Sequence, residues 1–421
     1  MPNTPAAASL QDRPAMSLLL LISLTHLLND MLQAVLPTLY PALKTEYDLS
    51  YGQLGLLTLV FHLVGALCQP LIGYWGDRRS QPWLLPSGML CMAVGLWLLA
   101  EAESFSGLLW VAALVGLGSS IFHPEAARAC RQVSAGRFGL AQSVFQLGGN
   151  IGSALAPLLI ALVLLPAGAQ GMTWLPLLAL VGFILLVRAG RSVKRHLGAR
   201  LRMNSSLPPM ASIGRRHLLL AMTLLSVMIL SKYAYLAAMA NYYSFYLIER
   251  FELSVAEAQL QLFVFLAAVA VGTMMGGPLG DRIGHRWVIL LSLLGSCPFT
   301  LLLPHVGFSA CVLLSVVIGV LMASAFPAII VYALQLLPNR VGLVAGYFFG
   351  LTFGVSGIAA AALGLLADRW GIEALFVVVA CLPLCGLLAL WLPTGQLHAQ
   401  SREGNGACCD DTHQPCCSSI D

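Results

Sequence analysis

The chain contains few charged residues. Asp, Glu, Lys and Arg make up only 10% of its 421 residues, whereas 58% are hydrophobic. This composition excludes an ordinary soluble globular domain, and a mean hydropathy of +0.84 indicates a protein of the lipid bilayer. The sequence also lacks a Gly-rich phosphate loop ending in Lys-Ser or Lys-Thr, which excludes ATP as the energy source. No group of residues typical of a catalytic site stands out, so we expect that the chain is not an enzyme.

Long apolar stretches account for most of the sequence. A helix that crosses a bilayer needs about 17 to 25 apolar residues, and twelve stretches meet this requirement: 17–39, 52–75, 82–101, 106–127, 138–165, 171–190, 217–247, 257–280, 285–303, 308–335, 342–366 and 372–393. The first run is too long, and too polar at its centre, for a cleavable signal peptide. We therefore expect it to remain as the first membrane helix.

A short string occurs twice in the chain, 204 residues apart. In each copy a glycine is followed four residues later by Asp-Arg: Gly73, Asp77, Arg78 and Gly277, Asp281, Arg282. A repeat at half the chain length indicates two related bundles of membrane helices. We predict an all-α membrane protein with twelve transmembrane helices in two pseudo-symmetric six-helix bundles. The expected segments are a tail at 1–16, a bundle at 17–190, a linker at 191–216, a bundle at 217–393 and a Cys-rich tail at 394–421.

The distribution of basic residues predicts the orientation in the membrane. With the N-terminus in the cytoplasm, 18 of the 22 Lys and Arg residues fall on the cytoplasmic side, eight of them within 188–216. Cytoplasmic loops are enriched in Lys and Arg, so we expect both termini in the cytoplasm. The net charge of +4 then reflects topology and not nucleic-acid binding.

The repeated string resembles the loop signature of the major facilitator superfamily. That signature continues after Asp-Arg with one residue, a glycine, one residue and an arginine. The second copy matches throughout, through Gly284 and Arg286, whereas the first copy has Ser80 in place of the second glycine. We expect the turn at the first copy to differ for this reason.

Within that superfamily the sequence resembles the fosmidomycin-resistance efflux proteins over about residues 17–393. Four strings carry the resemblance: Ser23-Leu-Thr-His26-Leu-Leu-Asn29-Asp30, Gly118-Ser-Ser-Ile-Phe-His123-Pro124-Glu125, Gln146-Leu-Gly-Gly-Asn150 and Ser231-Lys232-Tyr233. The resemblance implies export of a small anionic phosphonate drug across the bacterial inner membrane. We further expect a monomeric antiporter that uses the proton gradient and no cofactor.

The first predicted helix carries a polar stripe at mid-span. His26 and Asp30 are four residues apart and share a face, Gln33 follows on that face, and Asn29 lies alongside. Ionisable groups inside a membrane are expensive and mark functional sites. Asp30 is our first candidate for the proton-carrying carboxylate, with Asn29 and Gln33 as candidate substrate ligands. The alternative is a static hydrogen bond from Asp30 to His26 or to a neighbouring helix.

The seventh predicted helix carries the opposite charge. Lys232 falls near its midpoint, and Tyr233, Tyr235 and Tyr243 follow as further candidates for substrate binding. The residue equivalent to Lys232 under the 204-residue offset is position 28, two residues from Asp30. Lys232 either pairs with Asp30 across a central cavity as a gate, or binds an anionic substrate while Asp30 carries the proton. A purely structural ion pair is the third interpretation.

Polar groups on the fourth and fifth helices complete the candidate set. His123 and Glu125 are candidates for a proton relay to the cytoplasm, with Arg128 as a gating residue three positions after Glu125. A simple salt bridge between Glu125 and Arg128 is an equal alternative. The fifth helix places three amides at four-residue steps on one face, which we expect to line the cavity: Gln142, Gln146 and Asn150.

Two features suggest further roles. We interpret the two Gly-to-Asp-Arg strings as conformational latches on the cytoplasmic side, where each Asp would meet the positive end of a helix dipole. The C-terminal tail offers soft metal ligands, although their spacing matches no strong metal motif: Cys408, Cys409, His413, Cys416 and Cys417. An exporter of a metalloid or another small toxic compound is therefore an alternative function, and a non-transporting membrane sensor is a second.

Overall fold

The computed structural model describes residues 15–78, 83–134, 138–167, 169–198, 215–337 and 341–392, and the regular elements within these ranges are helical. The first half contains α1 (Met16–Thr38), α2 (Tyr40–Glu46), α3 (Tyr51–Arg78), α4 (Leu84–Ala100), α5 (Phe105–Val133), α6 (Phe138–Leu159), a π-helical segment η1 (Ile160–Leu164), α7 (Leu165–Ala167), α8 (Ala169–Met172) and α9 (Trp174–Gly198). The second half contains α10 (Arg215–Phe251), α11 (Val255–Ile283), α12 (His285–Leu302), η2 (Leu303–His305), α13 (Phe308–Leu336), α14 (Val341–Trp370), α15 (Ile372–Ala380) and η4 (Leu382–Trp391).

The helices confirm the predicted membrane protein. Among the described residues, 11 helical segments are long and apolar enough to cross a membrane, and α4 is a shorter apolar helix of 17 residues. These twelve segments correspond to the twelve predicted spans. Several helices extend past the predicted boundaries, since α9 continues to Gly198 and α10 already begins at Arg215.

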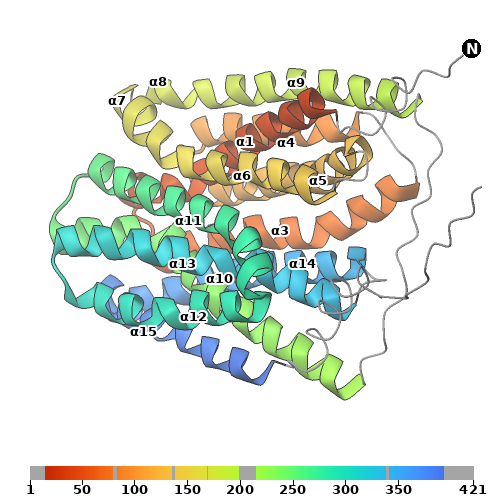
Figure 1. Ribbon diagram of the computed structural model, residues 1–421. Helices are drawn as coiled ribbons and strands as arrows, with labels where there is room; N and C mark the ends of the chain where they lie inside the picture. The colour runs from red at the N-terminus through yellow and green to blue at the C-terminus, as the bar shows by residue number, and fades with distance from the viewer. Residues whose placement is uncertain are drawn as a thin grey trace, which may run out of the picture.

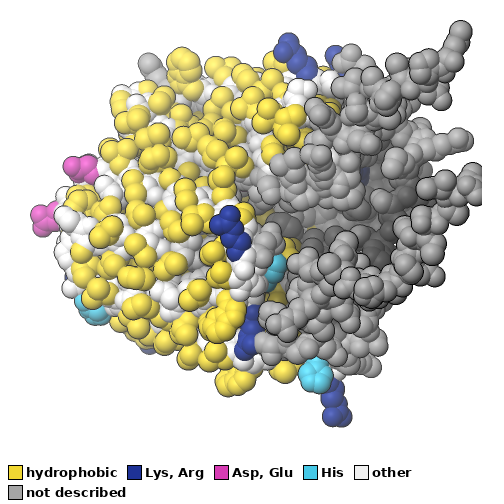
Figure 2. Space-filling model, viewed as in Figure 1, with side chains coloured by type: hydrophobic (Ala, Val, Ile, Leu, Met, Phe, Trp, Pro, Cys, Tyr) yellow, Lys and Arg dark blue, Asp and Glu magenta, His cyan; other side chains and the backbone are white. Residues whose placement is uncertain are grey.

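The surface of the bundle is apolar. Figure 2 shows hydrophobic side chains over most of the described surface, with acidic side chains at one end of the molecule. Large side chains such as Leu71 and Trp110 are exposed, at 69% and 70%. Because so wide an apolar surface is not stable in water, lipid must cover it, and a helix can cross lipid since it satisfies its own backbone hydrogen bonds.

The two halves form two bundles that lie side by side (Figure 1). Helices α1 to α9 make up one bundle and α10 to η4 the other, with α3 packed on α14 and α6 packed on α11 across the interface. We call the end of the molecule where α9 ends and α10 begins the linker end. The opposite end, where residues 47–50 connect α2 to α3, is the far end.

Glycines show where the backbones of α3 and α14 come closest. A Cβ atom at Gly55 of α3 would lie 2.5 Å from the backbone oxygen of Ala360, and one at Gly357 of α14 would lie 2.9 Å from the Cβ of His62. Gly350 and Gly354 share a helix face with Gly357 but lie closer to the linker end. No described atom lies within 4 Å of a Cβ built at either of them. Among the described residues, the closest backbone approach of α3 and α14 therefore lies nearer the far end. Toward the linker end a side chain makes the contact, since a Cβ at Gly65 of α3 would lie 3.6 Å from Phe353 of α14.

Candidate functional site

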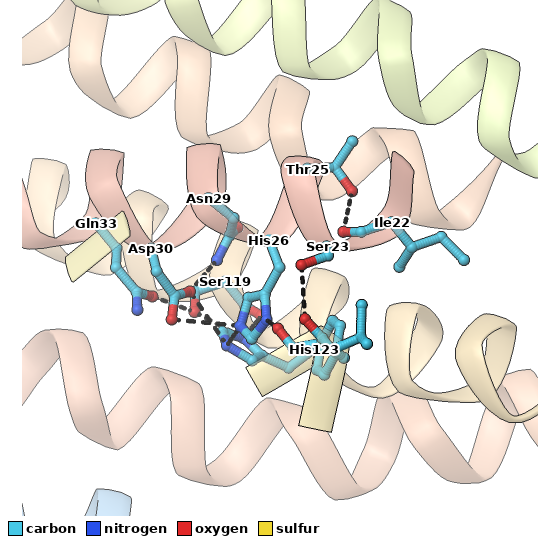
Figure 3. A network of polar contacts seen from close by, with 11 residues as sticks. Ile22, Ser23, Thr25, His26, Asn29, Asp30, Gln33, Ser119 and His123 are labelled. Carbon is cyan, nitrogen blue, oxygen red and sulfur yellow. Dashed lines mark hydrogen bonds and ion pairs between the residues drawn. The ribbon is translucent and has the colours of Figure 1, made fainter. Parts of the chain in front are cut away.

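Three ionisable side chains meet inside the first bundle (Figure 3). His26 and Asp30 lie on one face of α1 because they are one helical turn apart, and α5 contributes His123. The Nε2 atom of His26 lies 3.3 Å from Asp30 Oδ2, the Nε2 atom of His123 lies 3.4 Å from Asp30 Oδ1, and the two Nε2 atoms are 3.3 Å apart. We call these three residues the His–Asp–His centre.

The other ring nitrogens of the two histidines fix the protonation pattern of the centre. His26 Nδ1 lies 2.8 Å from the backbone oxygen of Phe145, and His123 Nδ1 lies 2.9 Å from that of Ser119. A carbonyl oxygen only accepts hydrogen bonds, so both Nδ1 atoms carry the proton. In the neutral rings both Nε2 lone pairs then face each other and the Asp30 carboxylate. Such an arrangement is repulsive unless a proton or another cation occupies it.

Two amide side chains orient the centre. Asn29 Nδ2 donates to Asp30 Oδ1 over 2.9 Å, and the hydroxyl of Ser119 donates to Gln33 Oε1 over 2.7 Å. Figure 3 shows these side chains converging on the centre from α1 and α5. Asn29 and Gln33, which the sequence suggested as substrate ligands, thus belong to the hydrogen-bond network around Asp30 and His123.

Helix α6 closes one side of the centre. The ring of Phe145 stacks on His26 with a centroid distance of 3.9 Å and an interplanar angle of 15°. One turn further along α6, a Cβ atom at Gly149 would lie 2.6 Å from Asp30 Oδ2 and 2.6 Å from His26 Cε1. Gly149 is therefore required for the close approach of α6 to α1.

Replacing Gly149 by Ala is expected to displace the centre. The added methyl group overlaps Asp30 and His26, and overpacking of this kind typically costs about 1–3 kcal/mol. The variant should unfold at a lower temperature in detergent and lose most of the transport activity. Gly295→Ala in α12 is the matched control, because no atom of the described residues lies within 4 Å of a Cβ there. A Gly149→Ala protein as stable and active as the control would contradict this account of the packing.

Phe353 links the second bundle to the centre. This α14 side chain places its ring centroid 6.2 Å from that of His123 and 5.6 Å from that of His62 on α3. Our sequence analysis did not single out Phe353, since an aromatic residue in an apolar helix carries no distinguishing signal. Its position means that movement of α14 against the first bundle reaches the environment of His123.

Lys232 lies on α10 and is buried, with 1% of its surface exposed. Its Nζ atom lies 5.1 Å from the ring centroid of Tyr233 and 5.3 Å from that of Phe326, distances at which a cation is attracted to an aromatic face. Among the described residues, no carboxylate comes within 4.0 Å of this ammonium group. A buried cation without a counter-charge favours an anionic ligand.

The structure does not contain the ion pair between Lys232 and Asp30 that one interpretation of the sequence proposed. Asp30 instead contacts His26, His123 and Asn29. The sequence could not reveal this arrangement because His123 is 93 positions away from Asp30, and only the packing of α5 on α1 brings them together. The gate interpretation is thus not realised in this conformation, in which the far end is closed.

The remaining tyrosines lie in the core of the second bundle. Tyr243 packs against Phe265 and Phe376, and its hydroxyl lies 3.8 Å from Cys311 Sγ. Tyr235 is buried as well. Tyr243 contacts α11, α13 and α15, so the structure gives it a packing role and does not place it beside the Lys232 ammonium group.

The polar residues of α5 and α6 occupy different environments. Arg128 and Glu125 form a salt bridge of 2.9 Å, the simpler of the two interpretations of this pair. Gln146 and Asn150 are half-buried on α6, and the Nδ2 atom of Asn150 is buried with no hydrogen-bond partner among the described residues. A buried amide donor of this kind is available to a ligand. The side chain of Gln142 lies outside the described part of the structure.

Most side chains of the predicted latches, and all the predicted metal ligands of the tail, lie outside the described part of the structure. Helices α3 and α11 contain the two repeated strings, and Arg282 is exposed at the linker end. The side chains outside the described part are those of Gly73, Asp77, Arg78, Gly277 and Asp281. The tail residues Cys408, Cys409, His413, Cys416 and Cys417 also lie outside the described ranges.

A carboxylate holds the two halves together at the far end. Asp368 of α14 accepts hydrogen bonds from the backbone nitrogens of Tyr51 and Gly52, over 2.6 Å and 2.7 Å, at the start of α3. The N-terminus of a helix attracts negative charge. Close by, the Tyr51 hydroxyl donates to Glu249 of α10. Our sequence analysis missed this contact, because acidic residues at outer helix ends are common and Asp368 had no feature to distinguish it.

Removing the Asp368 carboxylate is expected to loosen the far end. In Asp368→Ala, the interface loses two charge-assisted hydrogen bonds, so the far end should open more often. Spin labels at Glu103 and His305, one on each half, should report a longer mean distance in a cysteine-depleted background. Glu373→Ala is the control, since its partner Arg250 belongs to the same half. An unchanged distance in Asp368→Ala would show that this contact does not hold the far end closed.

The two-bundle architecture can now be compared with known proteins. The sequence profile described as Major Facilitator Superfamily matches residues 22–254 and 224–407. The chain belongs to the major facilitator superfamily. This superfamily consists of transporters, so the expectation that the chain is not an enzyme is confirmed.

Individual relatives extend over nearly the whole chain. The Fosmidomycin resistance protein of Escherichia coli (strain K12) is 48% identical over 92% of this chain and 95% of its own length. An uncharacterised MFS-type transporter of Bacillus subtilis (strain 168) is 37% identical over 90% of this chain and 93% of its own length. The predicted resemblance to the fosmidomycin-resistance proteins is confirmed.

A solved structure supports the same fold. A bacterial homologue of the human lysosomal transporter Spinster, crystallised in an inward-facing and occupied conformation, superimposes with a TM-score of 0.71. The match covers 93% of this chain and 97% of the homologue at 15% sequence identity. The likeness at this identity concerns the fold alone.

Proposed function

We propose that the chain is a proton-coupled antiporter that exports a small anionic drug, a phosphonate of the fosmidomycin type, by alternating access. The observation that carries the proton part is the meeting of two histidine Nε2 atoms at the Asp30 carboxylate. The substrate part is supported by buried Lys232 and by 48% identity to the Fosmidomycin resistance protein of Escherichia coli.

The His–Asp–His centre takes up and releases the proton in this proposal. Both Nδ1 atoms are held by carbonyl oxygens, so a proton that enters binds among the two Nε2 atoms and the Asp30 oxygens. The deprotonated centre is negatively charged, whereas the Lys232 site in the other half is positively charged. Protonation neutralises the first and anion binding neutralises the second. We infer that the halves rearrange when one of these charges has been neutralised, so that proton and drug cross in alternation.

Further residues have supporting roles. Gln146 and Asn150 are the candidate polar ligands of the drug on α6, and Gln142 is a third on the same helix. Glu125 and Arg128 remain candidates for the inner end of the proton path. The repeated strings, with Asp77 and Asp281, remain candidates for latches that hold the linker end closed in the opposite conformation: Gly73, Asp77, Arg78, Gly277, Asp281 and Arg282.

The orientation follows from the basic residues. The linker end, at which α1 begins (Figure 1), faces the cytoplasm of a bacterial inner membrane in this proposal. Export is driven by the proton gradient with no cofactor and no nucleic acid, and the working unit is one chain in the bilayer. With the far end closed, the described conformation is the one that accepts drug from the cytoplasm.

The proposal is tested by transport across everted membrane vesicles. We expect a drug-sensitive bacterial host to gain resistance to fosmidomycin when it expresses the chain. In energised everted vesicles, whose interior is acidic, fosmidomycin should raise the internal pH because drug enters as protons leave. Vesicles from the host without the chain are the control. Resistance without any proton movement would contradict proton coupling.

The alternative functions give other outcomes in the same host. A screen with phosphonates, metalloids and unrelated antibiotics separates the substrate classes. A metalloid exporter would confer metalloid resistance that is lost when the tail from residue 394 is removed, whereas phosphonate resistance should survive this truncation. A sensor would produce no substrate flux at all.

A further inference from the structure

The three atoms of the His–Asp–His centre are spaced like ligands of one tetrahedral metal ion. Their separations are 3.3 Å, 3.3 Å and 3.4 Å. Zinc binds histidine nitrogen and carboxylate oxygen at about 2.0–2.2 Å, which places neighbouring tetrahedral ligands about 3.3–3.6 Å apart. The two histidines and the aspartate could therefore bind such an ion with little movement.

The hydrogen bonds around the centre also fit a metal site. A histidine that binds a metal usually donates its other ring N–H to a carbonyl or carboxylate. His26 and His123 do so, to the backbone oxygens of Phe145 and Ser119. Asn29 in turn holds Asp30 Oδ1. All three candidate ligands are thus oriented before an ion binds, and both Nε2 lone pairs point at the same place.

Part of the centre is exposed. The side chains of Asp30 and His123 are 13% and 20% exposed, whereas that of His26 is 2% exposed. An ion can therefore reach the centre from the side of Asp30 and His123.

We propose that His26, Asp30 and His123 form a binding site for one divalent transition-metal ion of the zinc class, with a fourth position left for water. This proposal rests on the geometry of the three ligand atoms. It does not require that these atoms bind the transported proton. If they do, as in the proposed function, proton and metal are alternative occupants of the same atoms. Zinc would then inhibit export.

Zinc binding to the purified full-length protein in detergent tests this site. The four tail cysteines offer competing ligands, so the protein carries serine at each of them: Cys408→Ser, Cys409→Ser, Cys416→Ser and Cys417→Ser. After treatment with a chelator, equilibrium dialysis should give one zinc ion per chain. X-ray absorption should show only nitrogen and oxygen ligands, at about 2.0–2.1 Å, and no sulfur at about 2.3 Å.

Substitutions of the proposed ligands test whether the bound zinc ion lies at the His–Asp–His centre. Asp30→Asn and His123→Gln each remove one ligand, so affinity should fall by more than the roughly 10- to 100-fold that loss of an outer hydrogen-bond partner costs. His62→Gln is the matched control. It removes a histidine of α3 whose Nδ1 atom is bonded to the Thr58 backbone oxygen, and zinc binding should be unchanged.

Other results would overturn the site. These are an absence of zinc in the protein with serine in its tail, sulfur ligands in the absorption spectrum, or equal binding by the Asp30→Asn protein. The outcome is separable from that of the transport proposal. If Asp30→Asn abolishes proton-driven export but no zinc binds, the metal site is wrong and proton coupling stands. If zinc binds while Asp30→Asn exports normally, the metal site stands and the proposed role of Asp30 in proton coupling is wrong.

Discussion

Asp30→Asn is expected to abolish proton-driven export. The asparagine amide has nearly the same shape and can donate to a histidine Nε2 atom, so the protein should fold normally. The asparagine side chain cannot bind or release a proton, so the His–Asp–His centre no longer alternates between a negatively charged and a neutral form. Fosmidomycin resistance should fall to the level of the host without the protein, and fosmidomycin should no longer raise the internal pH of everted vesicles.

Exchange of labelled for unlabelled drug separates coupling from binding. Exchange across a membrane needs no net proton movement, so reconstituted Asp30→Asn should retain it. Asp48→Asn is the matched control, because Asp48 is exposed in the connection at the far end and its positive φ of 50° is readily adopted by asparagine. Proton-driven export by Asp30→Asn at the rate of this control would contradict the role of Asp30.

Lys232→Gln is expected to weaken drug binding strongly without destabilising the fold. The ammonium group contacts only aromatic faces among the described residues, so its removal breaks no described ion pair. Loss of one partner from a buried charge pair with the phosphonate costs about 2–5 kcal/mol, which raises Kd at least about 30-fold. Binding of labelled fosmidomycin to purified protein measures the change, and thermal unfolding in detergent measures the stability.

Lys44→Gln provides the control for this charge change. Lys44 also lies over a ring, 4.4 Å from the centroid of Tyr51, and donates to the backbone oxygen of Leu49 at the far end. It is remote from the proposed drug site, so its variant should bind fosmidomycin as the wild type does. Equal affinity in Lys232→Gln would remove Lys232 from the drug site. If export and its pH response were unchanged as well, the proposed coupling would fail.

The sequence predicted the architecture well because few folds are possible for a chain that crosses a bilayer. Apolar runs of spanning length become helices, and the 204-residue repeat requires two related bundles. The sharing of one α1 face by His26 and Asp30 also follows from helical periodicity alone. These features depend on neighbours along the chain, so they could be derived without knowing how the helices pack.

Features that depend on packing between distant segments were not predictable. The sequence suggested His123 as part of a proton path near Glu125, but could not show that it meets His26 and Asp30. The contact of Asp368 with the start of α3 joins residues 317 positions apart. Lys232 and Asp30 occupy nearly equivalent positions in the two halves, yet the histidines of the first half replace Lys232 as the partners of Asp30.

Proton release on drug binding tests the central claim most directly. Fosmidomycin is added to purified protein in weakly buffered solution, and a pH indicator counts the protons that appear per drug bound. If the His–Asp–His centre exchanges its proton for drug, wild-type protein should release more protons than Asp30→Asn, with both corrected for protonation of the drug itself. Equal release by the two proteins, each binding drug, would show that the exchanged proton resides elsewhere.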